Sequence, residues 1–131
     1  PPPAFDTRRL VPVEMPADVG VRMGVDPESL TIGADGVVRY VVVAQGLGGA
    51  VNAMYEGIRC STFEFRRYAR SSADGRWRSL DDDRWQRMSS SGPSPHPFRL
   101  AREGMCQGAA APTTVREILE ALRLTATQRA P

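Results

Sequence analysis

The residues best suited to chemistry lie in one short stretch, residues 55–60, whose sequence is Tyr-Glu-Gly-Ile-Arg-Cys. A phenol, a carboxylate and a guanidinium can share acid–base work when they meet in a cleft. Tyr55, Glu56 and Arg59 are therefore candidate binding residues, and one alternative function is a small periplasmic hydrolase or lyase that uses all three.

A structural role is the other interpretation of the same stretch. Glu56 and Arg59 could form ion pairs with Arg39 or Glu64, and partly buried pairs often serve structure alone. Because side chains alternate along a strand, an extended conformation would place Tyr55 and Arg59 on one face and Glu56 on the other.

The chain has two cysteines, Cys60 and Cys106. Paired use of a rare residue favours a disulfide, and closing a loop of this length would restrict the unfolded chain by roughly 4 kcal/mol. Disulfides persist in oxidising compartments, so the pair predicts an exported protein, in a bacterium one of the periplasm. The alternative is two unlinked thiols in a cytosolic protein. The spacing fits neither a redox Cys-x-x-Cys motif nor zinc ligands.

Other candidate sites are explained more simply by structure. His96 lies between two prolines and is interpreted as an exposed loop residue, because a general base needs a nucleophile and an orienting partner. The aspartates at 81–83 lack calcium-loop spacing and are predicted to start a helix that continues through 84–88. The glycine-rich segment 46–49 opens no helix, so it predicts a turn rather than a phosphate site. We predict no catalytic residue, metal or cofactor.

Arginines alternate with aromatic residues between positions 63 and 70, as they do in proteins that bind single-stranded nucleic acids. Nucleic-acid binding through Arg66, Arg67 and Arg70 is thus a further alternative. A strand with a buried aromatic face and a charged outer face is favoured instead, since the net charge is only +2. Nucleic acid is not an expected partner.

Alternating apolar residues and turn signals predict the strands that hold these side chains. Pro12 and Pro16 limit the segment before residue 19 to extended edge structure, and Asp35-Gly36 marks a hairpin. The predicted strands cover 19–25, 30–32, 37–43, 50–60 and 62–70, with a short extended piece beginning at Trp77.

Two helices are predicted near the C-terminus. Residues 98–105 form a short helix that leads to Cys106. Thr114 and Glu117 form a capping box, and apolar residues then recur at helical spacing: Val115, Ile118, Leu119 and Leu122. The expected fold is a single α+β domain, an antiparallel meander of about five strands with the C-terminal helix on one face and one disulfide. Residues 1–18 would be an extended N-terminal segment, 19–124 the domain and 125–131 a C-terminal tail.

With Asp35 to Tyr40, the hexapeptide at 55–60 and Cys106 in this order, the chain resembles the CNP1-like family of proteobacterial envelope proteins, which takes its name from a cryptic neisserial protein. The resemblance runs from about Val21 to Leu122, and the hexapeptide is its most specific part. It implies an exported protein, often with a signal peptide or lipoprotein leader. The family supplies no activity and no residue roles.

The function expected first is a non-enzymatic cell-envelope module that binds a protein or another envelope component, or serves a structural role. Its expected place is the periplasm after removal of a signal peptide, with a lipid anchor if the precursor carries one. No stretch reaches the roughly 20 apolar residues that span a bilayer.

Overall fold

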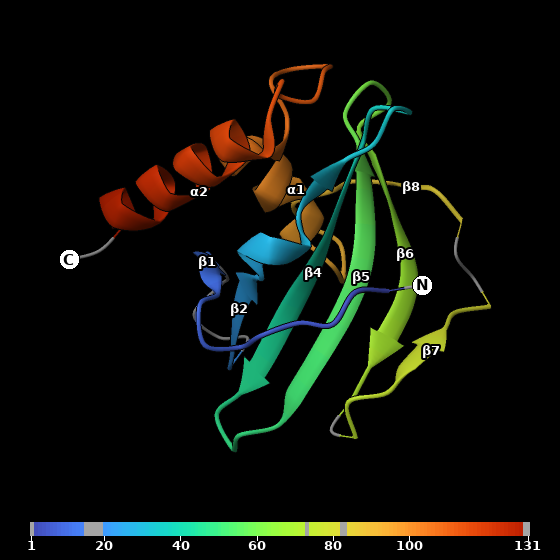
Figure 1. Cartoon of the computed structure of the whole chain (residues 1–131), viewed down its shortest axis with the longest axis vertical. Coiled ribbons are helices and arrows are strands. Elements are labelled where there is room, and N and C mark those ends of the chain that lie inside the picture. Colours follow the sequence, from blue (N-terminus) through green and yellow to red (C-terminus); the bar gives the residue numbers. More distant parts are fainter. Residues whose placement is uncertain (1, 15–19, 73, 82–83, 130–131) are drawn as a thin grey trace.

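The computed structural model describes residues 2–14, 20–72, 74–81 and 84–129. These residues contain an eight-stranded antiparallel sheet with the strand path β1-β2-β4-β5-β6-β7, to which β3 adds on β4 and β8 adds on β6 (Figure 1). The strands are β1 (Val11–Val13), β2 (Val21–Val25), β3 (Thr31–Ile32), β4 (Val37–Gly46), β5 (Val51–Arg59), β6 (Glu64–Ser71), β7 (Trp77–Ser79) and β8 (Gln86–Arg87). The predicted α+β class and antiparallel meander are confirmed, and the short strands β1, β7 and β8 widen the sheet beyond the five that we expected.

The long hairpin of β4 and β5 forms the centre of the sheet. Its β-branched residues fit a pleated surface buried on both sides. The preceding β3–β4 turn uses Gly36 at φ 78°, and the Asp35 carboxylate accepts a hydrogen bond from the Val37 amide at 3.0 Å. The predicted turn at 46–49 is also present, where the Gly49 amide donates to the Gly46 carbonyl at 3.0 Å.

The helices cover one face of the sheet, called here the inner face. They are α1 (His96–Leu100), a π-helical turn η3 (Ala101–Met105) and α2 (Val115–Arg129). The capping box is confirmed, because the Glu117 amide donates to the Thr114 hydroxyl at 3.2 Å. Ile118 and Leu122 are buried in the core with the inner side chains of β4 and β5. The helix α2 continues to Arg129, through residues expected to be a tail, because nothing in its sequence interrupts the helix.

The N-terminal segment crosses the opposite face, called here the outer face (Figure 1). Phe5 and Leu10 pack on a small apolar cluster of Val41, Val43 and Ala53. Trp77 holds the beginning of this segment, since its indole N–H donates to the Pro3 carbonyl at 3.1 Å. The sheet is therefore covered by helices on one side and partly by extended chain on the other.

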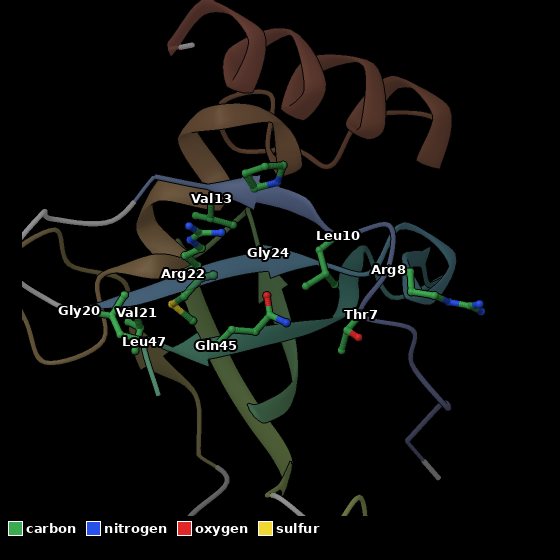
Figure 2. Close-up of a pocket in the computed structure, with 12 residues that line it drawn as sticks. Thr7, Arg8, Leu10, Val13, Gly20, Val21, Arg22, Gly24, Gln45 and Leu47 are labelled. Carbon is green, nitrogen blue, oxygen red and sulfur yellow. The ribbon is translucent and has the colours of Figure 1, made fainter. Parts of the chain in front are cut away.

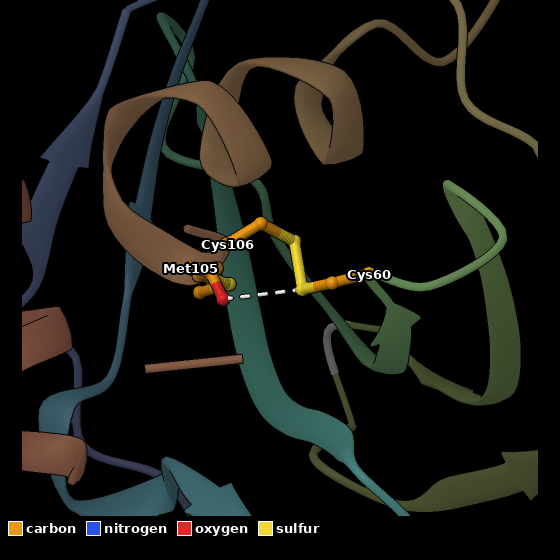
Figure 3. Close-up of a disulfide and its surroundings, with 3 residues drawn as sticks. All are labelled: Cys60, Met105 and Cys106. Atoms are coloured by element: carbon orange, nitrogen blue, oxygen red, sulfur yellow. Dashed lines mark hydrogen bonds between the residues drawn. A yellow bond between two sulfur atoms is a disulfide. The ribbon is translucent and has the colours of Figure 1, made fainter. Parts of the chain in front are cut away.

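The predicted disulfide is present between Cys60, which follows β5, and Cys106, which follows η3 (Figure 3). The two Cα atoms are 5.7 Å apart. The Cys60 sulfur also lies 3.5 Å from the Met105 carbonyl oxygen. A sulfur in a disulfide carries no proton, so this approach is a packing contact. The bond ties the helical layer to the end of the central strand.

The predicted helix at 84–88 is wrong. Gln86 and Arg87 instead form β8 beside β6, and the Met88 amide donates to the Phe63 carbonyl at 3.0 Å. Pairing with the edge of β6 satisfies these backbone groups, whereas the segment is too short to form a stable helix alone. Two of the aspartates expected to cap that helix, at positions 82 and 83, lie outside the described residues.

Within the described residues, no helix combines the length and the apolar character needed to cross a bilayer.

Candidate functional site

Glu56 lies at the centre of a buried polar cluster on the inner face. Its side chain is fully buried, and three side chains from other elements contact its carboxylate. The Tyr40 hydroxyl from β4 donates at 2.9 Å, and Arg67 Nε from β6 donates at 2.8 Å. His96 Nε2 from α1 lies 2.8 and 3.0 Å from the two carboxylate oxygens. The cluster thus joins three neighbouring strands to the first helix.

The charges in this cluster favour an ionised carboxylate. Burial by itself would raise the pKa of Glu56, but the charge and hydrogen bonds of His96 and Arg67 outweigh it and lower the pKa to about 2. Burial, together with the negative charge of Glu56, raises the pKa of Tyr40 well above its ordinary value. Tyr40 is therefore a neutral hydrogen-bond donor at physiological pH.

The interpretation of His96 as an exposed loop residue is wrong, because only 3% of its surface is exposed. Helix α1 begins at His96 and turns the imidazole into the core. The sequence held one indirect signal. Glu56 alternates with apolar residues that face the core, and a carboxylate at such a position needs buried donors.

Tyr55, Glu56 and Arg59 do not meet in one cleft. Glu56 points to the inner face, while Tyr55 and Arg59 alternate onto the outer face. The Tyr55 ring packs against Tyr68, with 5.4 Å between the ring centroids. The arrangement proposed for a hydrolase or lyase that uses all three residues is therefore absent.

The expected pairing of Arg59 with Glu64 is confirmed at 2.6 Å, and the hydrogen bond from Arg59 lowers the pKa of Glu64. Arg59 also stacks over Trp85, with its guanidinium carbon 4.2 Å from the ring centroid. The other expected partner, Arg39, pairs instead with Asp35 at 2.9 Å. These contacts give Arg59 and Arg39 structural roles on the outer face.

The arginines of β6 do not form one basic face. Arg67 alternates with Phe65 onto the inner face, where it pairs with Glu56, and the β5–β6 register shifts only after this pair, between Tyr55 and Glu56. Arg66 lies beside the Tyr68 ring, and Arg70 is exposed to solvent. Phe63 and Phe65 pack in the core, so they are not available to stack on bases.

The outer face carries an open groove of about 570 Å³ at the β1–β2 side of the sheet (Figure 2). It is formed by the N-terminal segment, β1, β2 and the turn between β4 and β5. The lining residues are Thr7, Arg8, Leu10, Pro12, Val13, Gly20, Val21, Arg22, Met23, Gly24, Gln45 and Leu47. The sequence does not reveal this site, because its walls come from separate segments. Two features of the sequence were available as signals. Arg22 lies between the apolar residues Val21 and Met23, and Leu47 lies in a glycine-rich turn.

A metal centre is not formed by the described residues, since no group of three or more of their His, Cys, Asp and Glu side chains is placed to hold an ion.

Comparison with known proteins defines the family alone. No curated protein and no solved structure matches this chain. The family model described as the CNP1-like family matches residues 1–123, which is nearly the whole chain. The chain therefore belongs to the CNP1-like family.

Proposed function

We propose that this protein is an exported, non-enzymatic binding module of the bacterial cell envelope, and that its outer face is the binding surface. The observation that carries the proposal is the groove beside β2, an open hollow of about 570 Å³ on a sheet whose other face is closed by helices. Volumes of this size are typical of small-molecule sites.

The contacts of Glu56 argue against acid–base catalysis by this residue. Its carboxylate is fully buried and engaged by Tyr40, Arg67 and His96. A general base must reach a proton on its substrate, and Glu56 is enclosed. The candidate residues that do lie on the outer face, Tyr55 and Arg59, are held by Tyr68 and by Glu64.

The disulfide between Cys60 and Cys106 supports export. Structural disulfides are rare where glutathione and thioredoxin keep thiols reduced, and common in the periplasm. The compartment is tested by expressing the precursor in a bacterium with an intact periplasm and trapping thiols with a maleimide before lysis. We expect a periplasmic protein that reacts only after reduction. Reactive cysteines in a cytosolic fraction would refute export.

Binding at the outer face is tested by photo-crosslinking in cells. A photo-reactive residue replaces Leu47, which is 85% exposed at the groove, and in a matched variant replaces Leu124, which is 59% exposed on α2. We expect a discrete crosslinked product from position 47 and not from position 124. Equal labelling at both positions, or none at position 47, would contradict the proposal.

A further inference from the structure

The strand pairing places a cation and an amide side by side in the groove. Arg22 of β2 lies directly opposite Gln45 of β4 in the antiparallel register. Directly opposed residues on one face of a sheet have Cβ atoms roughly 4.5–5.5 Å apart. Both residues line the groove (Figure 2). A guanidinium next to a side-chain amide offers several N–H donors to one anionic group.

Arg22 has no counter-ion among the described residues of the protein. The other arginine of the groove, Arg8, is neutralised by Asp6 at 2.9 Å. The described lining residues include no aspartate or glutamate. Among the residues that the structure describes, the groove therefore offers one uncompensated positive charge, which complements a ligand with a single anionic group.

Apolar side chains lie on both sides of this charge along the groove. Leu10 forms part of one wall, and Leu47 projects from the β4–β5 turn with 85% of its surface exposed. The two leucines lie on opposite sides of Arg22. Leu10 packs over Gly24, where a Cβ would lie 2.7 Å from Leu10 Cβ, whereas Leu47 follows Gly46, the partner of Val21 in the β2–β4 register. An exposed leucine beside an apolar hollow gains from being covered by an apolar ligand.

We propose that the groove binds a small molecule with one anionic head group and an unbranched apolar chain, with the head group at Arg22 and Gln45 and the chain against Leu47. This inference rests on the proposed function and specifies the ligand chemistry of the same surface.

Calorimetric titration with decanoate, below the concentration at which it forms micelles, tests both the head-group contact and the chain contact. We expect saturable one-to-one binding, and weak or no binding of acetate and decanol, which each lack one part of the ligand. Arg22→Gln should weaken decanoate binding about tenfold or more, because it removes a charged hydrogen-bond donor. Failure of decanoate to saturate, or equal binding of decanol, would overturn the proposal.

Matched variants separate the groove from general charge and hydrophobicity. Arg70→Gln removes an exposed arginine on β6, three strands away and about 14 Å distant. Leu47→Ala should weaken binding of decanoate, and Leu124→Ala, which truncates an exposed leucine on α2, should not. An unchanged unfolding temperature in every variant shows that the fold is intact. If Arg70→Gln weakens binding as much as Arg22→Gln, the groove is not the site.

An experiment with vesicles distinguishes the two sources of such a ligand, a membrane lipid and a free carboxylate. Sedimentation with vesicles that contain an anionic phospholipid, abolished by Arg22→Gln, assigns the head group to a membrane lipid. Decanoate binding without vesicle sedimentation assigns it to a free carboxylate. A crosslink from position 47 together with absent decanoate binding would refute this ligand chemistry and leave the proposed function standing.

Discussion

Three donors from three separate elements converge on the single carboxylate of Glu56. A buried charge is costly unless it is paired and hydrogen-bonded, and here the pairing is supplied by Arg67 and His96. The arrangement also explains why the polar cluster of Tyr40, Glu56, Arg67 and His96 can lie in an apolar core. Each member is useful to the fold only in the presence of the others.

Replacement of Glu56 by glutamine removes the charge and leaves Arg67 and His96 without an anionic partner. Breaking one side of a buried pair costs about 3–5 kcal/mol, so we expect a loss of this size in the free energy of unfolding, measured with urea. Glu28→Gln changes an exposed glutamate and should stay within about 0.5 kcal/mol of the natural protein. Equal stability of the two variants would contradict a stabilising role for the cluster.

Stability should also fall in acid because of Glu56. Its pKa is about 2 in the folded protein against an ordinary 4.5, so its contribution is complete above the unfolded pKa and is lost as the pH falls toward 2. The difference corresponds to about 3 kcal/mol. Urea unfolding between neutral and acid pH should show this loss.

Other carboxylates with lowered pKa values also contribute to acid sensitivity, among them Asp35 and Glu64. The comparison with Glu56→Gln isolates the buried group, since that variant keeps the surface carboxylates. We expect the free energy of unfolding to fall less in acid for the variant than for the natural protein. Parallel pH profiles would show that Glu56 has no part in the acid dependence.

At the scale of elements, the contact between η3 and α2 depends on a glycine. A Cβ on Gly104 would lie 2.7 Å from Ala121 Cβ and 3.2 Å from the Ile118 carbonyl oxygen. The glycine therefore lets the backbone of η3 approach α2 closely enough to bury Ile118 and Leu122. Because η3 leads directly into Cys106, the same contact positions the disulfide.

Gly104→Ala should destabilise the protein by about 1–3 kcal/mol, the usual cost of overpacking a well-packed contact. Thermal unfolding measures the effect. Gly48→Ala is the matched control, since a Cβ at that position meets no atom within 4 Å. Combining Gly104→Ala with Ala121→Gly should recover part of the loss, and strict additivity of the two variants would contradict the steric explanation.

At the scale of the whole molecule, the disulfide joins the two layers. Replacing both cysteines by alanine opens a link across 46 residues, and we expect a loss of about 4 kcal/mol in the free energy of unfolding. Urea unfolding of the oxidised protein, the reduced protein and the double variant measures this loss. The reduced protein should resemble the variant, and unchanged stability on reduction would contradict the expectation.

Local patterns in the sequence were sufficient for much of the fold. The β-branched run in β4, the Asp35-Gly36 turn and the Thr114–Glu117 capping box each act over a few residues, so their effects can be predicted without tertiary contacts. The same local reasoning gave a wrong prediction for residues 84–88, which do not form a helix. The polar start of this segment is typical of a helix, but the free edge of β6 provided the stronger set of backbone partners.

Periodicity, turn chemistry and the presence of one other cysteine were enough to predict the order of the central strands, the final helix and the pairing of Cys60 with Cys106. Long-range packing brought His96 to Glu56 across 40 residues, made Arg67 rather than Arg39 the ion-pair partner of Glu56, and opened the groove beside Arg22. These outcomes depend on which face each distant segment covers, and no short-range pattern contains that information.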